Sequence, residues 1–206
     1  MDFNVLEYRK RILDKVLAHI SLTGRERTID IGCGDGGDCE LLMESVKEAV
    51  GIDVEFNSNW QKNKKKQMEF SVADVCNLPF RDGSFDLVFE KDALHHVGKV
   101  AEASKEILRI TKTGGYIICV EANRYNPIFY VHMTLIRGHQ HFTKNFFAEL
   151  MKTYSDHVFF FPVESRIYPI KNKRLFELIH YFEDFLEGLP LIKNYLCYNV
   201  AIVKMA

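Results

Sequence analysis

The feature that most constrains the fold of this chain is a short strand that runs directly into a cluster of glycines. Residues 27–31 read Arg-Thr-Ile-Asp-Ile, a short β-branched segment that is typical of a strand. The loop Gly32-Cys-Gly34-Asp35-Gly36-Gly37 follows, and residues 38–47 then space their apolar side chains as a helix does. The order of strand, glycine-rich loop and helix indicates an α/β domain that binds a ligand at the loop.

Strands and helices alternate along the chain up to residue 120. A helix is expected over 3–21, and further strands are expected at 49–53, 69–73, 85–89 and 116–120, with a helix at 99–110 before the last of them. The residues 112–115 between that helix and that strand favour a turn. This alternation predicts a doubly wound, mostly parallel sheet with helices on both faces.

The pattern changes beyond residue 120. Residues 122–141 have no clean period, and Asn126-Pro127 favours a turn, so this segment is expected to form a lid. Thr143 is expected to cap a helix that runs to 154, and strands at 157–163 and 195–203 flank a helix at 174–186. We therefore expect one domain over 1–206, with a cofactor-binding core at 28–120, a lid at 122–156 and a C-terminal part at 157–206.

Composition excludes several classes of protein. The chain is 47% hydrophobic and 27% charged, as globular proteins are, and its net charge of −1 offers no overall attraction for nucleic acid or an anionic membrane. No uncharged apolar run of membrane-spanning length occurs, and the first residues carry charges where a secretory signal is apolar, so a cytoplasmic location is expected. Five cysteines without paired spacing indicate reduced, mostly buried thiols.

Two cofactors are compatible with the spacing of the glycine loop. The loop matches G-x-G-x-x-G, and Asp53 ends the next strand where a dinucleotide fold places its ribose-binding acid, so a nicotinamide-dependent oxidoreductase remains an alternative. However, Asp30, Asp35 and Asp38 surround the position of a pyrophosphate, which favours cationic or neutral surroundings. S-adenosylmethionine carries an ammonium and a sulfonium beside the same adenosine, and an acidic loop suits it better.

Five motifs in a fixed order extend this interpretation. They are Thr28-Ile-Asp-Ile-Gly-Cys-Gly-Asp-Gly36, Val50-Gly-Ile-Asp53, Ala73-Asp-Val-Cys-Asn-Leu-Pro-Phe-Arg-Asp-Gly-Ser-Phe-Asp-Leu-Val88, Ala93-Leu-His-His-Val97 and Glu106-Ile-Leu-Arg-Ile-Thr-Lys-Thr-Gly-Gly115. Over residues 28–120 the chain resembles the class I S-adenosylmethionine-dependent methyltransferases, above all their small-molecule subgroup. The resemblance implies a seven-stranded Rossmann-like sheet of order 3-2-1-4-5-7-6 with the last strand antiparallel. It also implies a helix after the second strand, which the short, lysine-rich stretch 57–66 suggests is abbreviated here.

The resemblance also implies the cofactor-binding residues. Asp30 with the backbone at Gly32 and Gly34 would hold the methionine part of the cofactor, and Asp53 would accept both ribose hydroxyls. The adenine would lie against Val54, with Asp74 accepting from its amino group and the Val75 amide facing the ring. Glu90 completes the expected cofactor set. A simple turn cap remains an alternative for Asp74, and a solvent-exposed strand end for Asp53.

The group that removes a proton from the acceptor is harder to identify. Candidates at the strand ends are His96, His95 and Asp92, with Glu90 and Glu121 beside them. Adjacent histidines on a helix point about 100° apart, so one of the two is expected to face the cleft; both could instead only pack the helix.

Metal binding is considered at two places and not expected at either. Asp92-x-x-His95-His96 resembles the acid and histidine cluster of quinone-pathway O-methyltransferases, some of which use a divalent metal, but one acid and two uncertain imidazoles make a thin site. His139-x-His141 could also bind a metal, but in a strand-like stretch the two imidazoles share a face only if no turn intervenes, and Gly138 suggests a turn. The lid histidines are therefore expected to act without a metal.

The expected acceptor is a small molecule. Residues 122–174 hold eight Lys/Arg against three Asp/Glu, which suits an acidic acceptor with an apolar body, whereas Phe159, Phe160 and Phe161 are expected in the core. If the lid and Lys62, Lys64, Lys65 and Lys66 formed one surface, an RNA methyltransferase would be the alternative. A catalytically silent scaffold is the third possibility, which the intact cofactor acids disfavour.

Overall fold

The computed structural model describes residues 3–206 except 63–66, 137, 169 and 171. The strands are β1 (Arg27–Ile31), β2 (Glu48–Asp53), β3 (Met68–Val72), β4 (Phe85–Lys91), β5 (Thr111–Ala122), β6 (Val158–Val163) and β7 (Tyr198–Lys204). The helices are α1 (Phe3–Leu17), α2 (Gly37–Leu42), α3 (Val100–Ile110), α4 (Pro127–Phe129), α5 (Lys144–Lys152) and α6 (Lys173–Gly188), with short helical segments η1 (Ser58–Gln61), η2 (Leu94–His96), η3 (Tyr130–Ile136) and η4 (Lys193–Tyr195).

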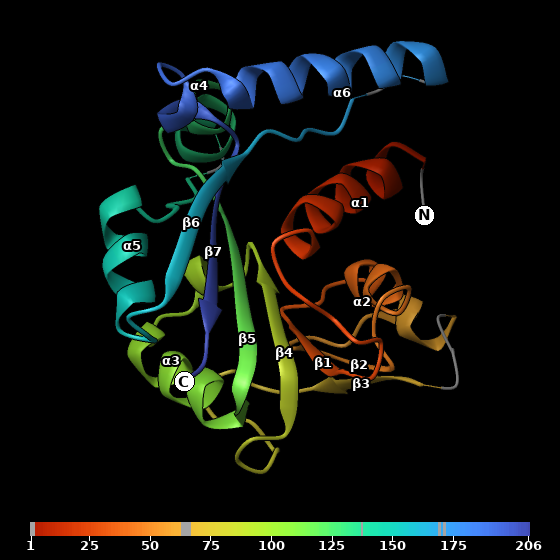
Figure 1. Ribbon diagram of the computed structural model, residues 1–206, viewed down its shortest axis with the longest axis vertical. Coiled ribbons are helices and arrows are strands. Elements are labelled where there is room, and N and C mark those ends of the chain that lie inside the picture. Colours follow the sequence, from red (N-terminus) through yellow and green to blue (C-terminus); the bar gives the residue numbers. More distant parts are fainter. Residues whose placement is uncertain (1–2, 63–66, 137, 169, 171) are drawn as a thin grey trace.

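The strands form one seven-stranded sheet of order β3-β2-β1-β4-β5-β7-β6, which confirms the predicted order. The pairings among β1 to β5 are parallel, while β7 runs antiparallel to both β5 and β6. Helices cover both faces, with α1 and α2 on one side and α3 and α5 on the other (Figure 1). The carboxyl ends of β1 to β5 therefore meet at one edge, where ligands bind in such sheets.

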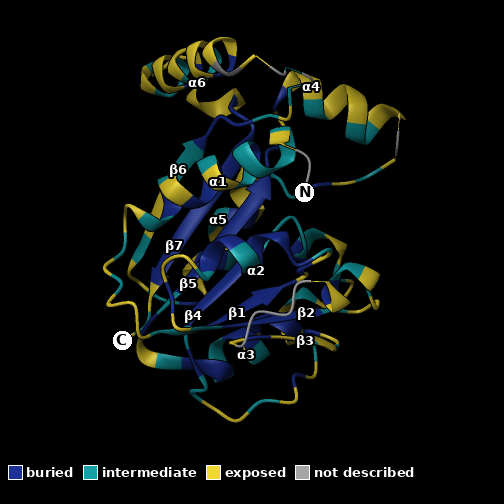
Figure 2. Cartoon of the chain, turned by 90° about the vertical axis from the view of Figure 1, so that its right-hand side faces the viewer, coloured by how far each residue is buried: buried dark blue, intermediate teal, exposed yellow. Residues whose placement is uncertain are grey.

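Strands β1, β4, β5 and β7 are buried on both faces and form the centre of the core (Figure 2). Their Val, Ile, Leu and Phe side chains pack against α3 and α5 on one face and α1 on the other. The edge strand β6 is different, because Phe159 is 50% and Phe160 38% exposed. The expectation of a core position is wrong for these two, since an edge strand has one neighbour and a thin covering.

The sequence pattern misplaced some element boundaries. The first helix ends at Leu17, not near 21, and the helix after the glycine loop ends at Leu42, not near 47. The predicted turn at 112–115 lies inside β5, where the ladder jumps from the Phe85–Thr111 pair to the Leu87–Tyr116 pair. Gly114, at φ +74°, permits this irregularity.

The lid contains a helix that the sequence pattern did not predict. Asn126-Pro127 is the start of α4, not a turn, and α4 continues as the π-helical η3. The Asn126 side chain accepts hydrogen bonds from the amides of Ile128 and Phe129, and proline occupies the first helical position. Asn-Pro starts turns and helices alike, so the dipeptide alone does not distinguish them.

Two other expectations hold. Thr143 caps α5 by accepting from the Phe146 amide, as predicted. The connection between β2 and β3 is short, with only η1 among its described residues, and Lys64, Lys65 and Lys66 lie outside the described part of the chain. No helix within the described ranges is long and apolar enough to cross a membrane.

Candidate active site

A cavity of about 930 Å³ opens at the carboxyl ends of β1 to β4. We call it the main cavity. Its walls come from 31–32, 52–55, 73–76, 92–94 and 96–99, with His139 above them. Seven of the predicted site residues line it: Gly32, Asp53, Val54, Asp74, Val75, Asp92 and His96. Its volume falls within the range of small-molecule and cofactor sites.

Gly32 allows the glycine loop to pass close to the turn after β4. Its φ is +71°, and a Cβ atom at this position would lie 2.4 Å from the Cβ of Ala93. The amides of Gly32 and Cys33 both donate to the Ile52 carbonyl at 2.9 Å, which ties the loop to the end of β2. No other residue type fits this position without displacing the cavity wall.

Asp53 stands at the end of β2 and joins the loop to the cavity. Its Oδ2 accepts from the Gly34 amide at 2.9 Å and its Oδ1 accepts from the Glu55 amide at 3.3 Å. The side chain remains partly exposed in the main cavity. A carboxylate can accept further hydrogen bonds beyond these two, so it can serve ligand hydroxyls as well.

The next wall of the main cavity combines an acid with apolar side chains. Asp74 is exposed and its Oδ1 accepts from the Cys76 amide at 2.9 Å, so the turn that it caps also places it in the cavity. Val54 is 66% exposed and Val75 is buried. A flat aromatic group with an amino edge would find an apolar surface and a carboxylate acceptor here.

The acids around the glycine loop are matched by cations. Asp35 pairs with Arg9 at 2.6 Å, and Asp38 pairs with Lys91 at 2.8 Å. Burial acts to raise the pKa of Asp35, but hydrogen bonds from Arg9 and the Gly37 amide lower it overall. Asp30 is buried beneath the loop, outside the cavity lining, and burial raises its pKa. The loop is thus less anionic than its sequence suggests.

Trp60 supports the loop from the side, a role with no sequence signal that we recognised. Its Nε1 donates to the Gly34 carbonyl at 2.8 Å, and its ring stacks on Phe70 at 5.3 Å between centroids. Gly51 leaves room for Phe70, since a Cβ there would lie 2.6 Å from that ring. Gly34 itself lies outside the cavity lining and acts through these loop contacts.

A second cavity of about 240 Å³, here called the histidine cavity, adjoins the first. Asp92, His96 and His139 line both cavities, whereas His95 and His141 line only the second. Apolar walls come from Ala122, Phe129, Met133 and Tyr198. Both histidines after β4 therefore reach a cavity. His139 and His141 also share one, so the turn at Gly138 does not keep these two imidazoles apart as expected.

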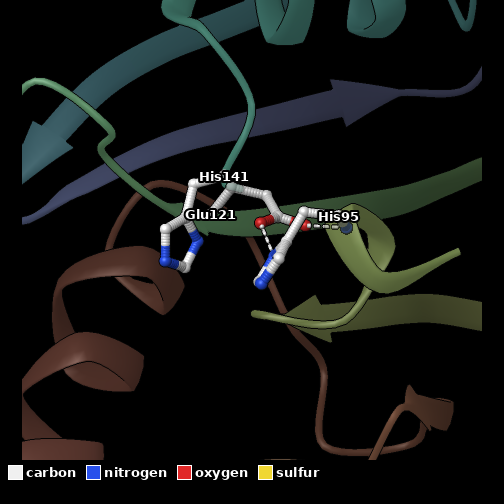
Figure 3. A group of neighbouring side chains, drawn as sticks. All are labelled: His95, Glu121 and His141. Atoms are coloured by element: carbon white, nitrogen blue, oxygen red, sulfur yellow. Dashed lines mark hydrogen bonds and ion pairs between the residues drawn. The ribbon is translucent and has the colours of Figure 1, made fainter. Parts of the chain in front are cut away.

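His95, which lines this cavity, forms a buried polar pair with Glu121, which lies just behind the lining. His95 Nδ1 lies 2.6 Å from Glu121 Oε2, and their side chains are 2% and 1% exposed. Burial and the Asp92 charge raise the pKa of Glu121 to about 8, and burial lowers that of His95. The His141 ring lies 4.4 Å from the His95 ring, and Figure 3 shows all three side chains converging.

Asp92 and Glu90 shape the turn that carries these histidines. Asp92 adopts φ +54°, uncommon for an aspartate, and its Oδ1 accepts from the Ala122 amide at 3.0 Å. Glu90 is fully buried and accepts from the Ala93 and Leu94 amides at 2.7 and 2.9 Å, outside either cavity lining. Burial raises the pKa of both acids. Such strain and burial are common at functional sites.

None of the described Lys and Arg side chains of 122–174 lines either cavity. Within the described ranges, the one Lys or Arg that lines either cavity is Lys99, which lies outside the lid. Lys144 donates to Asn194, Lys152 pairs with Glu149 and Arg166 pairs with Glu164. Arg137 and Lys171, which also belong to the eight basic residues of 122–174, lie outside the described residues.

Comparisons with known proteins find methyltransferases. Residues 29–119 match the model of a family described as a methyltransferase domain. A phthiotriol/phenolphthiotriol dimycocerosates methyltransferase of Mycobacterium ulcerans is 27% identical over 55% of this chain and 44% of its own length. The chloroplastic tocopherol O-methyltransferase of Arabidopsis thaliana is 30% identical over 55% of this chain and 37% of its own. The aligned region is therefore less than half of either relative.

Solved structures extend the likeness to the whole fold. A SAM-dependent methyltransferase of Thermotoga maritima superposes with a TM-score of 0.70 at 16% identity, covering 98% of this chain and 91% of that one. At this identity the match concerns the fold alone. It includes the part beyond residue 120, where the sequence resemblance is weak.

Proposed function

Since this chain belongs to the class I S-adenosylmethionine-dependent methyltransferases, we propose that it transfers a methyl group to a small-molecule acceptor in the histidine cavity. The observation that carries the proposal is the boundary between the two cavities. Asp92, His96 and His139 line both, so a cofactor in the main cavity and an acceptor in the histidine cavity would meet there.

The main cavity fits the cofactor, which supplies a methyl group on a positively charged sulfur when it is bound. In this proposal Asp53 accepts from the ribose hydroxyls, while Asp74, Val54 and Val75 hold the adenine. The backbone at Gly32 passes the methionine part, where the absence of a Cβ leaves room. Asp30, Gly34 and Glu90 contribute by holding the loop and the turn after β4.

The chain's own contribution to the transfer is alignment and removal of a proton. Direct displacement needs the acceptor atom held in line with the methyl group, which the narrow histidine cavity favours. His96 is exposed and lies at the boundary, so we assign it the proton of the acceptor. Asp92 and His95 are positioning residues, Asp92 through the Ala122 amide and His95 through Glu121.

The walls of the histidine cavity suggest the acceptor. Phe129, Met133 and Tyr198 offer apolar contacts, and the imidazoles offer hydrogen bonds to a hydroxyl or amine. The two relatives named above, one of them an O-methyltransferase of tocopherol, support a small acceptor with an apolar body. Five free cysteines agree with a reducing, cytoplasmic setting.

Two titrations and one labelling experiment test the proposal. Calorimetry is expected to show binding of S-adenosylhomocysteine and none of NAD; tight binding of NAD without a response to S-adenosylhomocysteine would overturn the cofactor assignment. A methyl-labelled cofactor is then incubated with a metabolite extract and, separately, with total RNA. Label in an extracted small molecule supports the acceptor class, whereas label in RNA alone would contradict it.

A further inference from the structure

Beside the histidine cavity, the His95–Glu121 pair meets His141, a side chain to which the proposed methyl transfer assigns no role. We propose that His95, Glu121 and His141 bind a divalent transition-metal ion of the zinc class. One ligand atom from each residue lies within 4.8 Å of the others, and the three side chains point to a common centre (Figure 3). This set differs from the Asp92-x-x-His95-His96 motif, whose acid and histidines resemble a metal cluster in sequence. It shares only His95 with that motif and adds Glu121 and His141.

Three of the four ring nitrogens of this cluster lack a hydrogen-bond partner within the described part of the chain. His141 is 5% exposed, and both of its ring nitrogens are buried without a hydrogen bond; the same holds for His95 Nε2. A buried polar atom without a partner destabilises the fold. Three such atoms at one place are rare in folded proteins, and a bound ion would satisfy the nitrogens that ligate it.

The kinds of ligand indicate the class of metal. Two imidazoles and one carboxylate are typical of zinc sites that keep an open position, while Mg²⁺ and Ca²⁺ prefer oxygen ligands throughout. Asp92, which raises the pKa of Glu121, and Glu90, whose side chain contacts Glu121, are two further buried acids beside the cluster. A cation here would offset the cost of burying these acids.

The geometry needs a small adjustment that the structure allows. Ligand atoms 2.0–2.2 Å from one ion are at most about 4.4 Å apart, and the three ligand atoms here lie within 4.8 Å of one another, so at most a small closure is needed. His141 can rotate because its ring nitrogens have no hydrogen bond to lose among the described residues, whereas His95 and Glu121 already touch. His95 and His141 line the histidine cavity, so the open position would face the acceptor; this last point rests on the proposed function.

Cobalt(II) is the probe for the test, because its visible absorption reports nitrogen and oxygen ligation. The full chain is stripped with a chelator, titrated with Co²⁺ and then challenged with Zn²⁺. We expect absorption that saturates at one equivalent and that Zn²⁺ abolishes. His141→Ala and Glu121→Gln are expected to weaken binding at least tenfold, and His157→Ala, an exposed histidine at the start of β6, to leave it unchanged.

Circular dichroism of each variant shows whether the fold is retained, and Glu121→Gln keeps the size of the side chain if His141→Ala unfolds. Absence of Co²⁺ absorption in the parent protein, or equal affinity in His141→Ala and His157→Ala, would overturn the metal site. These measurements need neither cofactor nor acceptor. A negative result for the metal would therefore leave the proposed methyl transfer standing. A negative result for methyl transfer would leave the Co²⁺ titrations interpretable.

Discussion

Gly32 is a position of the glycine loop that has no room for a side chain. Gly32→Ala would place a Cβ 2.4 Å from the Ala93 Cβ at φ +71°, so we expect a loss of roughly 1–3 kcal/mol in the free energy of unfolding and weaker binding of S-adenosylhomocysteine. Gly98→Ala is the matched control, because Gly98 also lines the main cavity but a Cβ there would meet nothing within 4 Å. Urea unfolding measures the free energy of unfolding of each variant, and calorimetry measures its affinity for S-adenosylhomocysteine. Equal losses in Gly32→Ala and Gly98→Ala would refute this explanation.

Asp53 is expected to supply much of the cofactor affinity. Asp53→Ala removes hydrogen bonds from a charged acceptor, each worth roughly 1.5–3 kcal/mol, so the affinity for S-adenosylhomocysteine should fall about tenfold or more. Asp156→Ala, an exposed acid distant in sequence from the cavity residues, serves as the control. Calorimetry gives the dissociation constants, and an unchanged value for Asp53→Ala would place the ribose elsewhere.

The site residues that the sequence could predict are those whose position follows from the strand next to them in the chain. Gly32 directly follows β1, Asp53 is the last residue of β2 and Asp74 comes shortly after β3, so the strand pattern also locates them at one edge of the sheet. Trp60 and His141 were not predictable in this way. Trp60 reaches Gly34 only because β1 and β2 pair, and His141 meets His95 only after the lid crosses the sheet edge.

Among the elements, the lid helix depends on Asn126. This side chain is 1% exposed, caps α4 and also donates from Nδ2 to the Tyr195 carbonyl at 2.7 Å. Asn126→Ala removes both the cap of α4 and the hydrogen bond to the Tyr195 carbonyl. We therefore expect the free energy of unfolding to fall by roughly 2 kcal/mol. Asn172→Ala removes only the exposed cap of α6 and should cost about 1 kcal/mol. Urea unfolding compares them; a larger loss at Asn172 would contradict this account.

The starts of three strands are joined by Asp86. Its Oδ2 accepts from the Arg27 amide at 2.9 Å and its Oδ1 from Lys112 Nζ at 2.8 Å. Burial acts to raise its pKa, but these hydrogen bonds lower it overall. A lowered folded-state pKa stabilises the fold above the unfolded value of about 3.9, and this contribution is lost as pH falls through the folded value.

Asp86→Asn should therefore destabilise the protein by about 1 kcal/mol at pH 7, and the difference from the parent should shrink as pH approaches 3.5. Urea unfolding at both pH values measures it, with the exposed Asp156→Asn as the control. A difference that grows toward low pH would have the wrong sign.

Element type was predictable for these strands, whereas the looped-out residues 112–115 of β5 depend on pairing with β4 that sequence spacing does not reveal.

For the whole molecule, the order of the strands was predictable only through the resemblance. Periodicity alone gives alternating elements and a parallel sheet, but not the position of β7 between β5 and β6. Contacts between the two ends of the chain were not predictable either. Arg11 of α1 pairs with Glu183 and Asp184 of α6 at 2.8 and 2.9 Å, and such pairs between helices far apart in the chain leave no pattern in the sequence.

Binding in the main cavity should stabilise the whole molecule, because its walls come from four strand ends that unfold together. A ligand at about 100 times its dissociation constant adds roughly 2.7 kcal/mol, and a domain of this size gains about 2–4 °C in Tm per kcal/mol. S-adenosylhomocysteine at that concentration should thus raise Tm by roughly 5–10 °C. Tenfold weaker binding in Asp53→Ala should about halve the shift at the same concentration, and NAD should cause none. Calorimetric scanning measures all three, and a full shift in Asp53→Ala would show that the ligand is held without the carboxylate at the end of β2.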